Sequence, residues 1–108
     1  MGNKLISIKV GTHVITSSDG LPDEGVISDI CSQISSVKKN GHQVVLISSG
    51  AVAAGRGIFK SPKITDTVEQ RQLLSSLGQV ELMLRYKKAF DKLDILCLLS
   101  AAASMLCI

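Results

Sequence analysis

Residues 44–57 read VVLISSGAVAAGRG and decide the fold, because their pattern changes in the middle. The first four residues are apolar and mostly β-branched, which is typical of a short strand buried on both faces. Ser48, Ser49 and Gly50 interrupt this run. The four residues that follow, AVAA, favour or tolerate a helix. The stretch therefore predicts a strand, a tight turn of small residues and the start of a helix.

The predicted turn indicates an anion-binding site. The N–H groups in the first turn of a helix have no intrahelical partner, and the helix dipole makes that end positive, so it binds phosphate or carboxylate well. Ligands of open α/β sheets bind beyond the carboxyl ends of the strands. At this position Ser48 and Ser49 offer hydroxyl donors, and Gly50 allows a ligand to approach the backbone closely. A plain connection made of small residues is the alternative interpretation. A P-loop is not indicated, because Arg56 and Gly57 stand where that motif has Lys and Ser or Thr.

The residues before this stretch predict a βαβ unit. Residues 5–10 read LISIKV and predict a mostly buried first strand with Lys9 near its carboxyl end. A helix is predicted to have Pro22 in its first turn and to end before Gly41. Its apolar stripe consists of Val26, Ile30, Ile34 and Val37. Because such a crossover is right-handed and joins parallel strands, we expect Lys9 and Ser49 at the same edge of the sheet.

Lys9 is the candidate for phosphate binding. A lysine late in a buried strand is unfavourable unless its ammonium group reaches a partner or solvent. The functional interpretation directs the ammonium at phosphate oxygens, with Gly11 giving close backbone access and Thr12 beside it. The alternative is a lysine that reaches solvent from an edge strand. His13 is interpreted as a loop residue, since no second metal-binding residue type accompanies it at a useful spacing.

The second half of the chain predicts a long helix and a third strand. Apolar residues recur at helical spacing from Leu73 onwards, and Gly78 among them indicates either a close helix contact or a break between two helices. Residues 95–108, ILCLLSAAASMLCI, carry no charge and are interpreted as a third buried strand followed by the start of a helix. They are too short to span a bilayer, which takes about 20 residues. Since no elements follow that would cover this apolar end, we expect a truncated domain.

The composition indicates one small globular unit, residues 1–108. Hydrophobic residues make up 45% of the chain and charged residues 19%, which excludes a disordered chain. The net charge of +3 is modest, its lysines are spread along the chain, and aromatic residues reach only 3%, so neither nucleic acid nor a membrane is expected as a partner. Three cysteines without a C-x-x-C pair indicate no metal site and no disulfide framework, but free thiols in the cytoplasm.

Several of these motifs together resemble the amino-acid kinase superfamily. The similarity lies in the first strand with Lys9-x-Gly11-Thr12, in the string SSGAVAAGR at residues 48–56 and in the run RQLLSSLGQ at residues 71–79. SSGAVAAGR is the most specific of these motifs. The likeness is strongest to the branch that phosphorylates the γ-carboxylate of L-glutamate with ATP, the first step towards proline.

The resemblance implies a three-layer α/β/α sandwich with a mainly parallel sheet, and a phosphotransferase whose product is L-glutamyl 5-phosphate. Mg²⁺ is expected on the nucleotide, and the full-length protein is expected to be a homo-oligomer. At the matching positions, Lys9 is expected to contact the ATP phosphates and to act in catalysis, and Gly11 and Thr12 to shape the loop on the phosphate side. The residues expected to hold the glutamate are Ser49, Gly50 and Ala51.

The chain also departs from the family pattern. The family's catalytic domain is much longer, and the residues that complete its glutamate and nucleotide sites lie beyond position 108. We therefore expect this chain by itself to lack kinase activity. Two alternatives stay open: another phosphotransferase of the superfamily that acts on a different carboxylate, carbamate or phosphate, and a non-catalytic fragment that associates with full-length subunits through exposed apolar surface.

Overall fold

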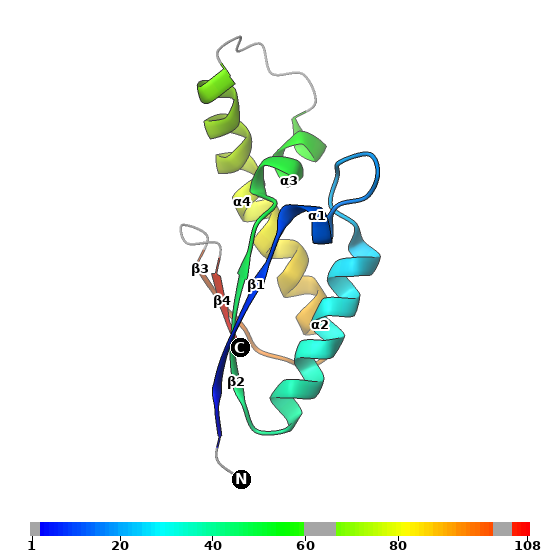
Figure 1. The fold of residues 1–108 in the computed structure, drawn as a ribbon, viewed down its shortest axis with the longest axis vertical. Coiled ribbons are helices and arrows are strands. Elements are labelled where there is room, and N and C mark those ends of the chain that lie inside the picture. The colour runs from blue at the N-terminus through cyan, green and yellow to red at the C-terminus, as the bar shows by residue number, and fades with distance from the viewer. Residues whose placement is uncertain (1–2, 60–66, 101–104) are drawn as a thin grey trace.

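Strands and helices alternate along the chain in the order expected of an α/β fold. A computed structural model describes residues 3–59, 67–100 and 105–108. Its elements in chain order (Figure 1) are β1 (Leu5–Val10), α1 (Thr12–Ile15), α2 (Glu24–Lys39), β2 (Gln43–Ser48), α3 (Ala51–Ile58), α4 (Thr67–Asp91), β3 (Leu98–Ser100) and β4 (Met105–Cys107). The strand, turn and helix predicted for residues 44–57 are β2, the bend after it and α3. None of the helices in these described ranges is both long and apolar enough to cross a membrane.

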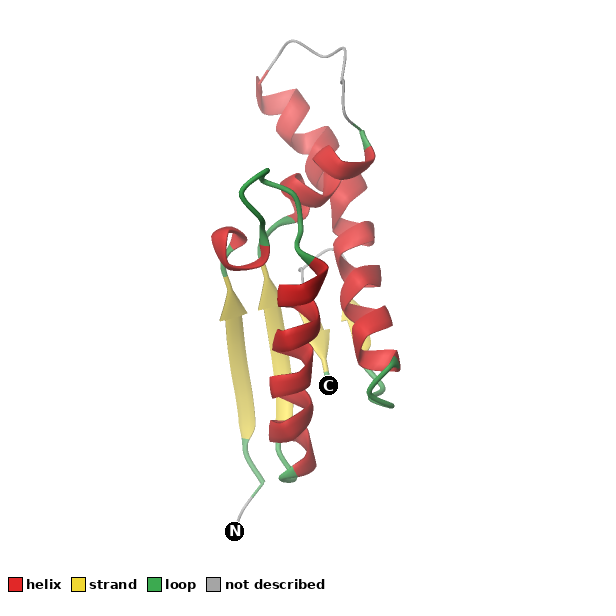
Figure 2. Ribbon diagram, turned by 90° about the vertical axis from the view of Figure 1, so that its right-hand side faces the viewer, coloured by secondary structure: helices red, strands yellow, loops and turns green. Residues whose placement is uncertain are grey.

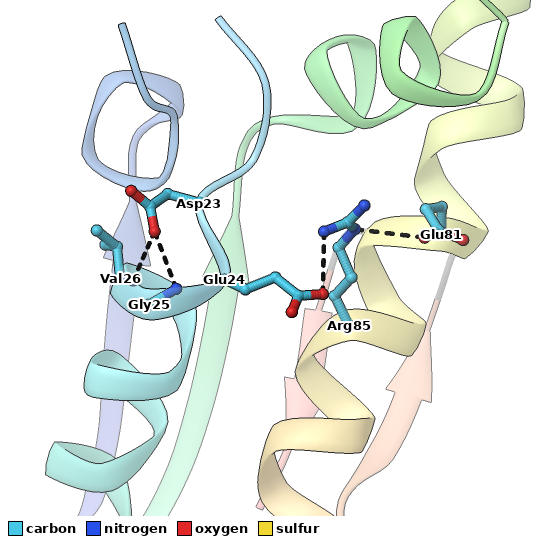
Figure 3. Close-up of polar contacts among 6 residues, drawn as sticks. All are labelled: Asp23, Glu24, Gly25, Val26, Glu81 and Arg85. Atoms are coloured by element: carbon cyan, nitrogen blue, oxygen red, sulfur yellow. Dashed lines mark hydrogen bonds and ion pairs between the residues drawn. The ribbon is translucent and has the colours of Figure 1, made fainter. Parts of the chain in front are cut away.

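Helix α2 connects β1 to β2 and has clear end signals. Asp23 caps its start, because its Oδ1 accepts hydrogen bonds from the N–H groups of Gly25 at 2.9 Å and Val26 at 3.2 Å (Figure 3). Pro22 therefore precedes the cap, so the prediction that it lies in the first turn of the helix is wrong. Asp23 provides both the extended backbone and the side-chain acceptor that an N-cap needs. At the other end, Gly41 with φ +91 turns the chain towards β2.

The buried face of α2 is rotated relative to the predicted stripe. Ile34 is buried as predicted, but the other three residues of the stripe are only half-buried. Ile27 and Cys31 are buried in their place, because α2 packs against α4 as well as against the sheet. An ion pair between Glu24 and Arg85, 3.3 Å long, also joins α2 to α4 (Figure 3).

The sheet has the strand order β1-β2-β4-β3. Strands β1 and β2 are parallel, which confirms the βαβ unit and the α/β class, whereas β4 pairs antiparallel with both β2 and β3. The predicted start of a helix after the third strand is wrong, since residues 105–107 form β4. Val44 and Ile108 exchange backbone hydrogen bonds of 3.1 and 2.8 Å. The segment thus satisfies polar groups at the edge of β2 that a helix would leave unpaired.

Helices α2 and α4 lie side by side on one face of the sheet (Figures 1 and 2). Along β2, Val44, Leu46 and Ser48 are buried on this face, whereas Val45 and Ile47 between them are half-buried. In the described part of the chain, β2 is therefore not buried on both faces as its apolar run predicts. The prediction that residues 5–10 are mostly buried is also wrong: β1 is an edge strand, and of its residues Val10 is buried. The second helical layer of the predicted three-layer sandwich is not among the described residues. The core includes Val10, Ile15, Ile27, Cys31, Ile34, Leu82, Met83, Tyr86 and Phe90.

Helix α4 runs without a break through Gly78, which confirms the close-contact interpretation of this glycine. A Cβ atom added to Gly78 would overlap the backbone carbonyl oxygen of Ala51 in α3. A Cβ atom added to Gly55 would overlap the carbonyl oxygen of Leu74 in α4. The two helices therefore cross with their backbones in contact. This close crossing requires glycine at positions 55 and 78, because any side chain there would collide with the other helix. This crossing fixes the start of α3 against α4.

Candidate functional site

The carboxyl ends of β1 and β2 lie at the same edge of the sheet, as the βαβ unit predicts. In the parallel register, Lys9 pairs with Ile47 and Val10 with Ser48. Directly after the strand, the N–H of Ser49 donates to the carbonyl oxygen of Val10 at 2.8 Å. The prediction that the lysine and the serine–glycine bend share one edge is therefore confirmed.

A cavity of about 770 Å³ opens at this edge, between α1, the loop that follows it and the start of α3. Of the predicted site residues, Thr12, Ser49, Gly50 and Ala51 line it. A larger cavity, of about 880 Å³, lies at the opposite end of the strands beside Leu5, and its lining is mainly apolar. None of the predicted site residues lines the larger cavity, so the cavity beside the bend is the candidate site.

Lys9 and Gly11 lie beside the cavity and are not part of its wall. Lys9 is exposed, and because paired residues of neighbouring strands share a face, its side chain leaves the sheet on the same face as that of Ile47, which does line the cavity. Gly11 has an extended backbone, and a Cβ atom there would meet no other atom within 4 Å. The fold itself therefore does not require glycine at this position, and close approach of a ligand to Gly11 stays a prediction.

The bend depends on Gly50. This residue is the N-cap of α3 with φ +115, a conformation that side chains rarely adopt, and a Cβ atom there would come within 2.6 Å of Cδ1 of Ile15. Glycine offers no side-chain acceptor, so no side chain at this position caps the first turn of α3. Ala51, Val52 and Ala53 of that turn line the cavity. The positive end of the helix dipole therefore faces this space and favours an anion there.

The two serines of the bend differ in accessibility. Ser48 is only 1% exposed, and its hydroxyl lies 2.7 Å from the hydroxyl of Tyr86 and donates to the carbonyl oxygen of Ser49 at 3.0 Å. Burial raises the pKa of Tyr86, and the hydrogen bond with Ser48 opposes that shift. Both serines line the cavity, but Ser49, unlike Ser48, is exposed. The predicted role of Ser48 as a hydroxyl donor to a ligand is therefore wrong, because its hydroxyl bonds internal partners. Ser49 is the serine of the bend whose side chain a ligand can reach.

Two arginines that sequence reasoning did not assign to the site line the same cavity, Arg56 of α3 and Arg71 of α4. Arg56 follows Val52 by four residues, so helical spacing brings both to one side of α3. That signal is present in the sequence, whereas Arg71 reaches the cavity from a different helix. His13, interpreted as a loop residue, lies in α1 and also lines the cavity. The added guanidinium groups suit a phosphate or a carboxylate.

The cysteines and acidic residues form no metal site in the described part of the chain. Within that part, no group of three His, Cys, Asp or Glu residues is placed to hold an ion. Cys31 and Cys97 are buried free thiols. Burial, with the nearby Cys97 thiol adding to it, raises the pKa of Cys31 to about 12, which keeps this thiol protonated at neutral pH. Neither thiol is therefore suited to act as a thiolate ligand or nucleophile.

Comparison with known proteins shows which sequences this chain is similar to. The family model described as the amino acid kinase family matches residues 4–105. Among curated proteins, the chain is 39% identical over 87 residues to the glutamate 5-kinase of Pelobacter propionicus, covering 81% of this chain and 23% of that protein. It is 44% identical over 85 residues to the glutamate 5-kinase of Bacteroides thetaiotaomicron, covering 79% and 24%. For the glutamate 5-kinase of Chlorobaculum tepidum the identity is 41% over 87 residues, covering 81% and 24%. The chain spans about a quarter of the length of these relatives.

Proposed function

The chain belongs to the amino acid kinase family, and from this premise we propose that the cavity beside the β2–α3 bend binds L-glutamate for ATP-dependent phosphorylation of its γ-carboxylate. In the proposed reaction, a γ-carboxylate oxygen attacks the terminal phosphorus of ATP, the bond from that phosphorus to ADP breaks, and L-glutamyl 5-phosphate forms. The substrate is assigned because the similar curated proteins are named glutamate 5-kinase. Their shared name supports the proposal.

One observation carries the proposal: the parallel register brings an exposed lysine and the uncapped start of α3 to a single edge. Phosphoryl transfer between two anions requires mainly positioning and stabilisation of negative charge. Ser49, Gly50 and Ala51 provide a hydroxyl and backbone N–H groups for a carboxylate of glutamate. Arg71 of α4 adds a cation to the lining of the same cavity.

The nucleotide is assigned to the side of the cavity on which β1 ends. Lys9 is proposed to contact the ATP phosphates, and its ammonium offsets the charge of the transferring group. Gly11 and Thr12 follow Lys9 directly and form the backbone on that side. Mg²⁺ is proposed to arrive on the nucleotide and to neutralise part of the phosphate charge when bound. The reaction is proposed to occur in the cytoplasm, where buried thiols stay reduced.

The chain by itself is proposed to bind ligand without completing the reaction, because it spans about a quarter of its relatives. Glutamate binding is tested by titrating the isotope-labelled chain with L-glutamate while following backbone amide shifts. We expect shifts at Ser49, Gly50 and Ala51, and much smaller ones with L-glutamine, which lacks the γ-carboxylate. Shifts that are absent, or that cluster away from the bend, would overturn the assignment.

Matched serine variants sharpen this test. Ser49→Ala removes the exposed hydroxyl in the cavity and should weaken glutamate binding by about fivefold, the effect of one hydrogen bond. Ser36→Ala removes an exposed hydroxyl on α2 and should leave the affinity unchanged. A coupled assay for ADP release with glutamate and Mg-ATP is expected to show no turnover above the blank. Turnover by this chain would contradict the proposed incompleteness.

A second candidate function rests on the larger, mainly apolar cavity at the opposite end of the strands. Leu5, Leu96 and Leu98 line it and are all highly exposed. We propose as an alternative that this surface associates with full-length subunits of the same family. Those full-length subunits are themselves proposed to form homo-oligomers. Light scattering on mixtures with a full-length relative distinguishes the two. A chain that stays monomeric in the mixture counts against the alternative.

A further alternative is a phosphotransferase with a different substrate. A panel of other carboxylates, carbamates and phosphates, tested for binding to the chain, distinguishes it from the proposed function.

A further inference from the structure

We propose that Tyr86 is a positioning residue of the candidate site: through the hydroxyl of Ser48, its buried hydroxyl holds the bend after β2 in the conformation that presents the start of α3 to an anion. The ligand-binding part of this inference rests on the proposed function, whereas the conformational part does not. The sequence pattern places Tyr86 on the apolar face of α4, where it reads as core.

The hydrogen bonds between Tyr86, Ser48 and Ser49 run in a single direction. Oγ of Ser48 lies 3.0 Å from the carbonyl oxygen of Ser49 and 2.7 Å from the hydroxyl of Tyr86. A carbonyl oxygen only accepts, so the single proton of Ser48 is donated to Ser49. Tyr86 must then donate its own proton to Oγ of Ser48. The chain of donors runs from Tyr86 to Ser48 to the backbone of Ser49.

These bonds hold both peptide units around Ser49. On one side, its N–H donates to the carbonyl oxygen of Val10 at 2.8 Å and ties the bend to β1. On the other side, its carbonyl oxygen accepts from Ser48. In a planar trans peptide the N–H points opposite to the carbonyl, so the N–H of Gly50 is directed away from the buried hydroxyl of Ser48. Without that hydroxyl, the peptide unit between Ser49 and Gly50 loses its internal partner.

Tyr86 is itself held in place and remains a donor. It is fully buried on α4, whose backbone contacts Ala51 of α3 through Gly78. Burial raises its pKa, so the phenol stays protonated at neutral pH. A buried tyrosine hydroxyl normally requires a hydrogen-bond partner, and within the described residues Ser48 is that partner. Helix α4 therefore contacts the residues on both sides of the bend. It packs against the backbone of Ala51 after the bend and forms a hydrogen bond with Ser48 before it.

Four variants test the positioning role. Tyr86→Phe keeps the ring and removes the donor, Ser48→Ala breaks the chain at its middle, and the double variant combines both. Phe90→Leu, at a fully buried position on the same helix, is the control for lost core packing. Each is compared with the parent chain by amide hydrogen exchange at Ser49, measured relative to the amide of Leu46, and by titration with L-glutamate.

We expect faster exchange at Ser49 and about fivefold weaker glutamate binding in each single variant, the effect of one lost hydrogen bond. The double variant should bind no more weakly than Ser48→Ala alone, because both substitutions break the same chain. The control Phe90→Leu should lose stability but keep the relative exchange rate and the affinity of the parent. A purely structural role for Tyr86 predicts instead that its variant behaves like the control.

Unchanged relative exchange at Ser49 in both single variants, or additive affinity losses in the double variant, overturns the positioning role. If the parent binds no glutamate, the proposed function fails, and the exchange measurement alone then decides the role of Tyr86. If Tyr86→Phe does not fold, Ser48→Ala decides it by the same exchange and affinity measurements.

Discussion

Replacing Gly78 by alanine should destabilise the chain, although alanine is the better helix former. In a helix interior, alanine is favoured over glycine by about 1 kcal/mol. The added Cβ would overlap the carbonyl oxygen of Ala51 and the backbone nitrogen of Gly55, and backbone atoms cannot rotate away as a side chain does. Overpacking typically costs about 1–3 kcal/mol, and here α3 must move as a unit. We therefore expect a cost at the upper end of that range and a net loss of about 2 kcal/mol.

Gly57→Ala is the matched control, because it makes the same chemical change inside α3. Among the residues that the structure describes, a Cβ atom there would meet Cδ2 of Leu21 alone, at 3.9 Å, which is an ordinary contact. The helix preference of alanine then remains, and we expect a gain of about 0.5–1 kcal/mol. The free energies of unfolding of Gly78→Ala and Gly57→Ala should thus change in opposite directions and differ by about 3 kcal/mol.

Urea unfolding followed by far-UV circular dichroism measures both effects. The m-value of a small domain is about 1–3 kcal/mol per M of urea, so the loss in Gly78→Ala should lower the unfolding midpoint by about 1 M. A Gly78→Ala variant as stable as the parent would refute the backbone contact between α3 and α4. It would also remove the reason for a fixed position of Ala51 at the cavity.

Three further side chains test the charges and burial described above. Lys9→Met should change the free energy of unfolding by less than about 0.5 kcal/mol, because Lys9 is exposed, but should weaken Mg-ATP binding in calorimetry; unchanged affinity removes Lys9 from the phosphate site. Hydrogen bonds, above all from the N–H of Val26, lower the pKa of Asp23 below 3.8, so its carboxylate stabilises the fold above that value and the contribution is lost as the pH falls through the lowered pKa. The stability difference between the parent and Asp23→Ala, measured by urea unfolding, should therefore shrink in acid, and a constant difference contradicts the cap. The pKa of about 12 for Cys31 predicts that a thiol reagent modifies it at neutral pH only after denaturation, and rapid modification of the folded chain contradicts its burial.

The elements that the sequence predicts are those with local causes. The strand, bend and helix of residues 44–57 follow from a change in pattern within a few positions. Because a βαβ crossover fixes the direction of its strands, the shared edge of Lys9 and Ser49 follows without knowledge of other contacts. Gly78 is conspicuous in a helical pattern, but its partner, Ala51, lies far away in the sequence, on another helix. No local rule identifies that partner.

The end of the chain could not be predicted because its apolar pattern fits more than one structure. An uncharged apolar run is compatible with a buried strand and with a buried helix. The outcome at residues 105–107 depends on the edge of β2, whose unpaired backbone groups accept a neighbouring strand. The face of α2 is likewise decided by a distant element: Cys31 is buried because α4 lies beside α2. In both places, a contact between segments far apart in sequence overrides the local pattern.

The candidate site combines both kinds of cause, and this explains which of its residues the sequence reveals. Ser49 and Gly50 belong to the bend and are found from its local pattern, whereas Ala51, the first residue of α3, is predicted from the family resemblance. Arg71 and Tyr86 come from α4, whose periodicity reads as a core helix. They reach the bend because Gly78 allows the backbones of α3 and α4 to touch. Gly78 weakens α4 as an isolated helix by about 1 kcal/mol, but it is required for the site to assemble. Gly78→Ala, which strengthens the isolated helix, should therefore separate Arg71 and Tyr86 from the bend.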